Sequence, residues 1–111
     1  MSGYDYLASP YYHDDPAVRQ ARVVAVCKAA DKLMSQGRVI FSPIAHGYAI
    51  EHLAMTEIKG YDFWMQQDIP LLRHANRLIV LMLDGWMNSR GIRREIDIAI
   101  SLKMTIDHIL P

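Results

Sequence analysis

The chain has 111 residues, of which 51% are hydrophobic, and this suits one domain over residues 1–111 with its own core. Twelve basic and twelve acidic residues cancel, which argues against a partner that is a nucleic acid polymer. The single cysteine, Cys27, has no internal disulfide partner, and the longest apolar runs are too short to span a bilayer. Without a secretion signal at the N-terminus, we expect a cytoplasmic protein that makes no membrane contact.

The first part of the chain predicts a strand, a helix and a second strand. Residues 4–8 predict the first strand. In the helix that follows, Asp15 caps the free N–H groups and Pro16 takes the first position. Six apolar residues recur at helical spacing and are assigned to the core side: Val23, Val26, Cys27, Ala30, Leu33 and Met34. Gly37 is expected to end this helix in a left-handed backbone conformation. Residues 38–41, a short run with β-branched Val39 and Ile40, predict the second strand.

The middle of the chain is harder to assign. Residues 42–60 have no clear period and predict irregular structure with a short helix around residues 50–55. Residues 61–74 predict a helix that Pro70 kinks or interrupts.

The last third predicts a buried strand over residues 77–83, because its apolar run is continuous. A helix capped by Asn88 or Ser89 then runs to about Lys103, and a final strand covers residues 105–110. The alternation of strands and helices predicts an α/β domain with a small parallel sheet of four to five strands, flanked by helices.

Ligands of open parallel sheets bind outside the carboxyl ends of the strands. Three segments should meet there: residues 9–14, 42–48 and 84–95. The first two carry polar and aromatic side chains, namely Tyr11, Tyr12, His13, Ser42, His46 and Tyr48. These aromatic rings could stack on a planar ligand or simply cover the core, and the sequence favours neither interpretation.

Glu95 is the most specific candidate for chemistry. It lies in the first two turns of the last helix, whose N-terminal N–H groups can bind an anion. Helical spacing places Glu95 on the edge of an inward face made by Ile92, Ile96, Ala99 and Ile100. The carboxylate would then be half-buried and point to the ligand site. The alternative is a surface glutamate paired with Arg93 or Arg94.

Two further patterns concern partners. Ile98 and Leu102 form a second apolar strip on the last helix, of the kind that marks an interface between copies of a chain. His46 and His52 stand in an irregular region without zinc-type spacing, and neither a glycine-rich phosphate loop nor a nucleophile elbow is present. We therefore predict no metal and no cofactor.

Four segments resemble a known family. They are residues 6–11 (YLASPY), 41–46 (FSPIAH), 81–86 (LMLDGW) and 89–96 (SRGIRREI). In order and spacing they are similar to a short, uncharacterised family within the nucleoside 2-deoxyribosyltransferase-like superfamily, and the resemblance covers the whole chain. It implies a flavodoxin- or Rossmann-like arrangement of the predicted sheet.

The resemblance also implies roles for individual residues. The superfamily's nucleophilic glutamate falls on Glu95, which would attack the sugar C1′ of a nucleoside or nucleotide and form a glycosyl-enzyme ester. Tyr6 would orient this carboxylate, and Asp68 matches an aspartate in the helix before strand three. The positions implied around the substrate are Ser9, Pro10, Tyr11, His46, Asn76, Asp84, Trp86, Ser89, Arg90 and Gly91.

Three departures from the superfamily bear on the reaction. Asn76 stands where relatives have an aspartate that assists the leaving base, and an amide cannot deliver a proton at pH 7. Asp68, His46 or a water would then have to supply it. The chain is shorter than the transferases, which favours hydrolysis over base exchange. The relatives' phosphate loop is replaced by Ser-Pro-Tyr-Tyr-His, which leaves Arg90 and the helix N-terminus as candidates for a 5′-phosphate.

Three functions follow from these patterns. The leading hypothesis is N-glycosidic bond hydrolysis or transfer on a small-molecule nucleoside or nucleotide, in a homodimer or higher homo-oligomer. The second is a non-catalytic module that binds a nucleotide derivative, which Asn76 favours. The third is an interaction protein held to its partners by the strip of Ile98 and Leu102.

Overall fold

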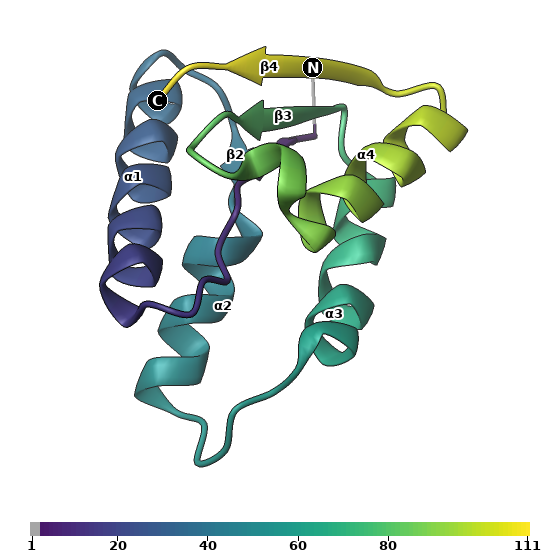
Figure 1. Ribbon diagram of the computed structural model, residues 1–111. Helices are drawn as coiled ribbons and strands as arrows, with labels where there is room; N and C mark the ends of the chain where they lie inside the picture. Colours follow the sequence, from purple (N-terminus) through teal and green to yellow (C-terminus); the bar gives the residue numbers. More distant parts are fainter. Residues whose placement is uncertain (1–2) are drawn as a thin grey trace.

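A computed structural model describes residues 3–111 as an α/β domain with one sheet (Figure 1). The elements are β1 (Asp5–Ala8), α1 (Pro16–Ser35), β2 (Ile40–Phe41), α2 (Pro43–Leu53), α3 (Tyr61–Arg73), β3 (Arg77–Leu81), the short 3₁₀-helix η1 (Trp86–Asn88), α4 (Arg90–Ser101) and β4 (Thr105–Ile109). No helix within residues 3–111 is long and apolar enough to cross a membrane.

All strand pairs are parallel, in the order β2-β1-β3-β4. In the register, Asp5 of β1 lies between Ile40 of β2 and Arg77 of β3. The chain leaves β1 toward β2 and then crosses back to β3, so the direction of the strand order reverses between β1 and β3. This position is the topological switch point, where ligands of such sheets bind. The predicted α/β class with a small parallel sheet is confirmed, and the sheet has four strands where four to five were predicted.

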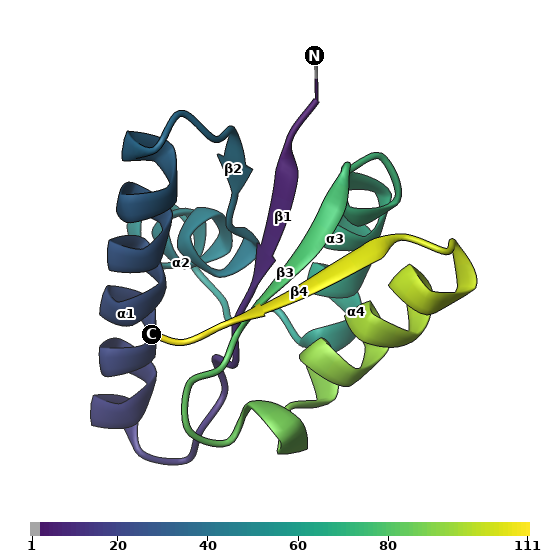
Figure 2. The ribbon, with the colours of Figure 1, turned by 90° about the horizontal axis from the view of Figure 1, so that it is seen from above.

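Helices cover both faces of the sheet. Figure 2 shows α1 on one face and α3 and α4 on the other. Because side chains of a strand alternate between the faces, β1 and β3 supply both cores. The α1 face buries Leu7, Val26, Ala30, Leu33, Ile79, Leu81 and Leu83. The α3/α4 face buries Tyr6, Ala8, Leu72, Leu78, Val80, Ile92 and Ala99.

The helix α1 begins and ends as predicted. The Asp15 side chain accepts a hydrogen bond from the N–H of Ala17 (2.9 Å), and Gly37 has a left-handed φ of 87°. The prediction for Cys27 is wrong, because its side chain is exposed. Met34 is also 51% exposed. The buried stripe of α1 is narrower than predicted and consists of Val23, Val26, Ala30 and Leu33.

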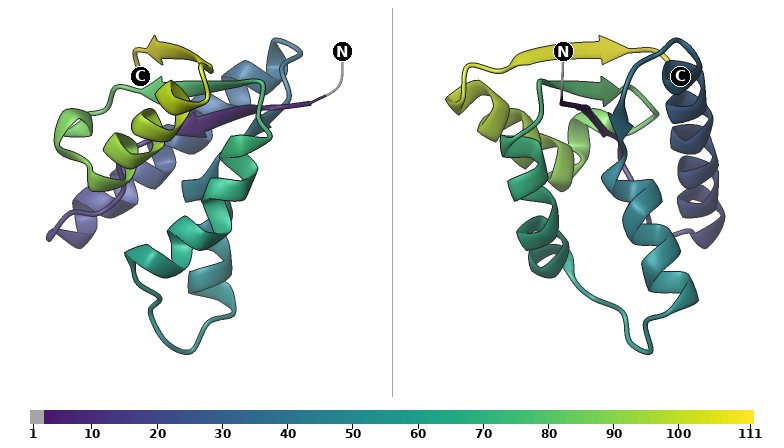
Figure 3. Two further views of the ribbon diagram at one scale, coloured as in Figure 1. Left: turned by 90° about the vertical axis from the view of Figure 1, so that its right-hand side faces the viewer. Right: turned by 180° about the vertical axis from the view of Figure 1, so that it is seen from behind.

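The prediction of mainly irregular structure after residue 42 is also wrong, since α2 starts at Pro43. Ser42 Oγ accepts from the N–H of Ala45 (3.2 Å), and Pro43 occupies the first position, as Asp15 and Pro16 do in α1. α3 continues through Pro70. The connection over residues 54–60 lies far from the sheet in both panels of Figure 3.

The helix α4 buries a charged side chain among apolar ones. Ser89 Oγ caps the helix by accepting from the N–H of Ile92 (3.3 Å). The buried residues are Ile92, Glu95 and Ala99, whereas Ile100, predicted to face inward, is 62% exposed. In the proposed strip, Ile98 packs partly against the core and Leu102 is 41% exposed. The inward face of α4 is therefore centred on Glu95.

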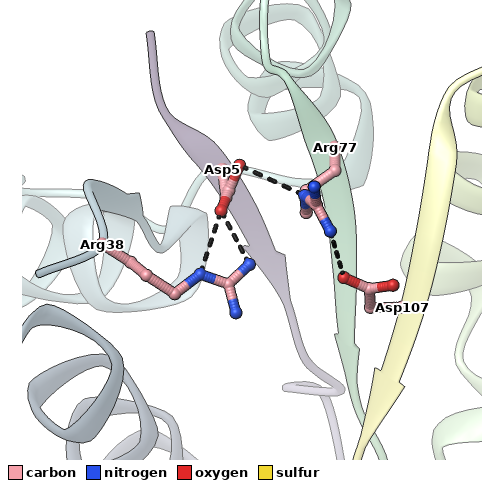
Figure 4. Close-up of polar contacts among 4 residues, drawn as sticks. All are labelled: Asp5, Arg38, Arg77 and Asp107. Carbon is pink, nitrogen blue, oxygen red and sulfur yellow. Dashed lines mark hydrogen bonds and ion pairs between the residues drawn. The ribbon is translucent and has the colours of Figure 1, made fainter. Parts of the chain in front are cut away.

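A network of charged residues lies on the α1 face of the sheet, around the start of β1 and β3 (Figure 4). Asp5 pairs with Arg38 (2.7 Å) and with Arg77 (3.8 Å), and Arg77 also pairs with Asp107 of β4 (2.8 Å). Each charge in this network has a partner of opposite sign, and the arginines stay partly exposed. The network connects β1, β3 and β4.

Candidate active site

The candidate site is built around a buried contact between β1 and α4. Tyr6 points to the α3/α4 face, and its hydroxyl donates a hydrogen bond to Glu95 Oε2. Tyr6 is completely buried and Glu95 is only 4% exposed. The two residues are 89 positions apart in the chain, so the parallel sheet and the crossover helix bring them together. Arg93 and Arg94 are exposed, and the alternative interpretation of Glu95 as their surface partner is wrong.

Asp68 of α3 adds a second buried carboxyl on the same face. It is 5% exposed, and its Oδ1 has no hydrogen-bond partner among residues 3–111. Its charge raises the pKa of both Tyr6 and Glu95, as expected for a neighbouring group. None of the ion pairs within the described residues joins Asp68 or Glu95 to a cation.

The environment holds these groups in unusual protonation states. Burial raises the pKa of Glu95 to about 8, the Tyr6 hydroxyl opposes this shift, and Asp68 adds to it. Burial raises the pKa of Asp68 to about 6. Burial, and then Glu95, raise the pKa of Tyr6 well above its usual range. Near pH 7 the two carboxyls therefore hold about one proton between them.

A series of aromatic rings leads from this group to the surface. The ring centroids of Tyr6 and Phe41 are 5.7 Å apart, and those of Phe41 and His46 are 5.5 Å apart. His46 is exposed. Sequence reasoning missed Phe41, although it ends β2 directly before the helix cap and lies opposite Tyr6 in the register.

The loop after β1 brings three predicted residues to the carboxyl edge. Ser9 is 5% exposed, and its Oγ has no hydrogen-bond partner within the described part of the chain. Pro10 is fully buried. Tyr11 is half-buried and makes an edge contact with Tyr48 of α2, with centroids 6.4 Å apart. Tyr11 and Tyr48 are both half-buried, so part of each side chain stays accessible to solvent.

The segment after β3 contributes residues with mainly structural contacts. Trp86 packs against the core and lies near His108 (5.4 Å between centroids). The Ser89 hydroxyl is engaged in the cap of α4. The Arg90 guanidinium lies 3.7 Å from the centroid of Tyr61, in a cation–π contact between the starts of α3 and α4. Gly91 follows directly in the first turn of α4.

Two open grooves lie beside this arrangement. One, of about 910 Å³, runs between α3 and α4 and is lined by Tyr61, Met65, Arg90, Arg94 and Asp97, among others. The other, of about 900 Å³, lies between α1 and the segments after β1 and β3, and its lining includes Tyr12, His13, Arg22, Asp84 and Asn88. Glu95 lines neither groove.

Comparison with known proteins gives the family and the fold. The model of a domain of unknown function, DUF1937, matches residues 3–108. The chain belongs to the DUF1937 family. Its structure is similar to that of a 2-deoxyribosyltransferase from Bacillus psychrosaccharolyticus, with a TM-score of 0.70 and 21% identity over 97% of this chain and 72% of that one. That enzyme is described as a biocatalyst for the synthesis of antiviral and antitumoral nucleosides. A search of curated proteins finds no match.

This likeness confirms that the DUF1937 domain has the predicted nucleoside 2-deoxyribosyltransferase-like fold. Its structure groups Tyr6, Asp68 and Glu95, and places Ser9, Pro10 and Tyr11 at the carboxyl edge. Asn76 instead precedes β3 at the amino edge, where its N–H donates to the Tyr4 carbonyl (2.8 Å) and its side chain lies beside Gly3. Among residues 3–111, no group of three or more His, Cys, Asp or Glu side chains could hold a metal ion.

Proposed function

We propose that this DUF1937 domain cleaves or transfers the N-glycosidic bond of a nucleoside or nucleotide, with Glu95 as the nucleophile. The observation that carries the proposal is the buried Tyr6–Glu95 hydrogen bond beside a second buried carboxyl, with no cation paired to either carboxyl within the described residues. Burying acids in this way costs stability, and such strongly perturbed groups are concentrated at functional sites. The fold of the transferase neighbour supports the substrate class.

The reaction would proceed in two displacements. An oxygen of the Glu95 carboxylate attacks C1′, and the C1′–N bond breaks with its electron pair leaving on the base. Asp68, the second buried acid, delivers a proton to that base. Water, or a second base, then gives a proton to the Asp68 carboxylate as it attacks C1′, and the C1′–O bond to Glu95 breaks to release Glu95 as a carboxylate. Two displacements at C1′ retain the configuration of the sugar.

The proton shared by the carboxyls sets the pH dependence. Attack requires ionised Glu95, and donation requires protonated Asp68. Since burial raises the pKa of Glu95 to about 8 and that of Asp68 to about 6, ionised Glu95 increases toward about pH 8 while protonated Asp68 decreases above about pH 6. We expect a bell-shaped profile with its maximum between these values. The productive form requires the shared proton on Asp68.

Base release from a panel of ribo- and deoxyribonucleosides and their monophosphates tests the proposal. Free base is followed by chromatography for the wild type, Glu95→Gln and Asp97→Asn. Asp97 is the matched control, because it is an exposed acid on the same helix. We expect Glu95→Gln to lower the rate at least ~1,000-fold and Asp97→Asn to leave it unchanged. Turnover by Glu95→Gln at the wild-type rate would rule out the nucleophile.

The low exposure of Glu95 favours a second candidate, a module that binds a nucleotide derivative without turnover. In that case a ligand of the panel would raise the melting temperature of the protein, and no base would appear over hours. The ligand would bind equally well to Glu95→Gln.

The homodimer or higher homo-oligomer remains a proposal of its own. Ile100 and Leu102 are the exposed apolar residues of α4. If copies associate through them, Ile100→Lys should lower the molar mass measured by light scattering after gel filtration. A wild-type protein that stays monomeric at high concentration would contradict the proposal.

A further inference from the structure

Arg22 of α1 ties together the two segments that border the switch point. Its Nη1 donates to the carbonyl of Tyr12 (2.8 Å) in the loop after β1, with a longer contact to the carbonyl of Tyr11 (3.4 Å). Its Nη2 donates to the carbonyl of Asp84 (2.9 Å) in the turn after β3. Residues 12 and 84 are far apart in sequence, and one half-buried side chain joins them.

The chemistry of the guanidinium suits this task. It is planar, always charged, and presents several N–H donors in fixed directions, so that one group can satisfy carbonyls from two segments at once. None of the ion pairs within residues 3–111 includes Arg22, and carbonyl oxygens receive its donors. A lysine offers a compact ammonium and could not reproduce the fork.

The turn after β3 is shaped to admit the guanidinium. Gly85 follows Asp84, whose carbonyl accepts from Arg22, and has a φ of 86°, a backbone conformation that residues with a side chain rarely adopt. A Cβ at this position would lie 2.8 Å from Arg22 Nη2. Glycine therefore meets two requirements here, the backbone conformation and the close approach of Arg22.

The two tied segments carry the proposed site. The loop after β1 holds Ser9 and Tyr11, and its first residues continue the strand that carries Tyr6. The turn after β3 leads through η1 to Ser89, which caps the helix that carries Glu95. We infer that Arg22 is a positioning residue of this site, holding the loop after β1 and the N-terminus of α4 at a fixed separation. The expected effect of Arg22 on turnover rests on the proposed function, whereas its link between the two segments does not.

Arg19, one turn earlier on α1, offers a matched control. It donates to the carbonyls of His13 and Asp14, both in the loop after β1. It thus holds that loop against α1 in a similar way, and among the hydrogen bonds of residues 3–111 it makes none to the turn after β3. Of these two arginines, Arg22 is the one that connects both segments.

Hydrogen exchange and kinetics of Arg22→Met, Arg22→Lys and Arg19→Met test the inference. We expect Arg22→Met to speed amide exchange at least ~3-fold in both residues 9–14 and residues 82–89, because each segment loses a hydrogen bond from the Arg22 guanidinium. Arg19→Met should affect residues 9–14 alone. With a nucleoside that the wild type cleaves, kcat of Arg22→Met should fall at least ~10-fold, as for a misplaced catalytic group. The kcat of Arg22→Lys should lie between those of the wild type and Arg22→Met. The kcat of Arg19→Met should stay within ~2-fold of the wild-type value.

Either of two exchange results would overturn the inference: unchanged exchange in residues 82–89 of Arg22→Met, or an increase spread evenly over the whole chain. Wild-type kcat in Arg22→Met would also overturn it. If Arg22→Met does not fold, Arg22→Lys gives the same comparison at smaller amplitude. If the wild type cleaves nothing in the panel while exchange in Arg22→Met changes in both segments, the proposed function fails. The inference that Arg22 holds the two segments together is then still supported.

Discussion

The acidic side chains on the two faces of the sheet differ in burial and in ion pairing. On the α1 face, Asp5 lies between two arginines at the amino edge, where solvent still reaches the network. On the α3/α4 face, Glu95 and Asp68 are almost fully buried, and no ion pair of the described residues gives either of them a cation. The strand β1 contributes to both arrangements, through Asp5 on one face and Tyr6 on the other.

The difference separates a structural use of charge from a functional one. The network around Asp5 joins neighbouring strands, and partly exposed pairs of this type each contribute about 1 kcal/mol or less. Buried acids without a cation destabilise the fold, and they are retained where their perturbed pKa is useful. We expect substitutions in the network around Asp5 to change stability alone, and substitutions of Glu95 and Asp68 to change activity and stability in opposite directions.

The largest expected effect in this comparison concerns proton donation by Asp68. Asp68→Asn removes the buried acid and keeps the shape of the side chain. We expect base release to fall ~100- to 1,000-fold and the decline on the alkaline side of the maximum to disappear from the profile, because that decline reports the loss of the Asp68 proton. Rates measured across pH 5–9 check this. An unchanged profile would show that another group, such as His46 or a water, supplies the proton.

The next effect is a gain in stability from removing the charge of Glu95. Its pKa is raised by burial to about 8 in the folded state, above the 4.5 of an unperturbed glutamate. Between these values the unfolded chain releases a proton that the folded protein keeps, so wild-type stability decreases as the pH rises from about 4.5 to about 8. Glu95→Gln has no such loss and should be about 3 kcal/mol more stable at pH 7.

Denaturant unfolding of wild type and Glu95→Gln at several pH values measures this gain. The advantage should vanish near pH 4, where the glutamate is protonated in both states. Asp97→Asn, on the exposed side of α4, should show no gain at any pH. Equal stability of wild type and Glu95→Gln at pH 4 and pH 8 would mean that Glu95 is ionised at little cost in the folded protein.

The smallest effect belongs to the α1 face. Asp5→Asn removes the acceptor of two arginines and should lower the free energy of unfolding by about 1 kcal/mol. The loss should shrink at high salt because the pairs are partly exposed. Base release should stay at the wild-type rate. A fall in activity greater than the fall in stability would contradict the division between the two faces.

Local signals in the sequence predicted most of the fold. The Asp15–Pro16 cap and Gly37 define α1, and the apolar run of residues 77–81 defines β3. The start of α2 carried the same Ser42–Pro43 signature and was missed, because its apolar residues, such as Ile44, Ile50 and Leu53, follow no one-sided helical pattern. Cys27 was misplaced because a long helix beside a small sheet buries a narrow stripe only.

The site was less predictable for a physical reason. A hydrophobic pattern treats a glutamate as polar and assigns the inward face of α4 to its isoleucines, which is why Ile100 was placed inside. The structure buries Glu95 there instead, against the local rule, as functional residues do. The resemblance to a known family indicated Glu95, Tyr6 and Asp68. It could not reveal Phe41 or Arg22, whose roles come from three-dimensional contacts.

Trapping the covalent intermediate tests the role of Glu95 most directly. A 2′-fluoro analogue of a cleaved nucleoside slows both displacements, and a good leaving base restores the first, so that the ester accumulates. Mass spectrometry of peptides from the treated protein should then show one added sugar on the peptide that contains Glu95, and none in Glu95→Gln. A sugar on another residue, or complete turnover of the natural nucleoside by Glu95→Gln, would contradict the account.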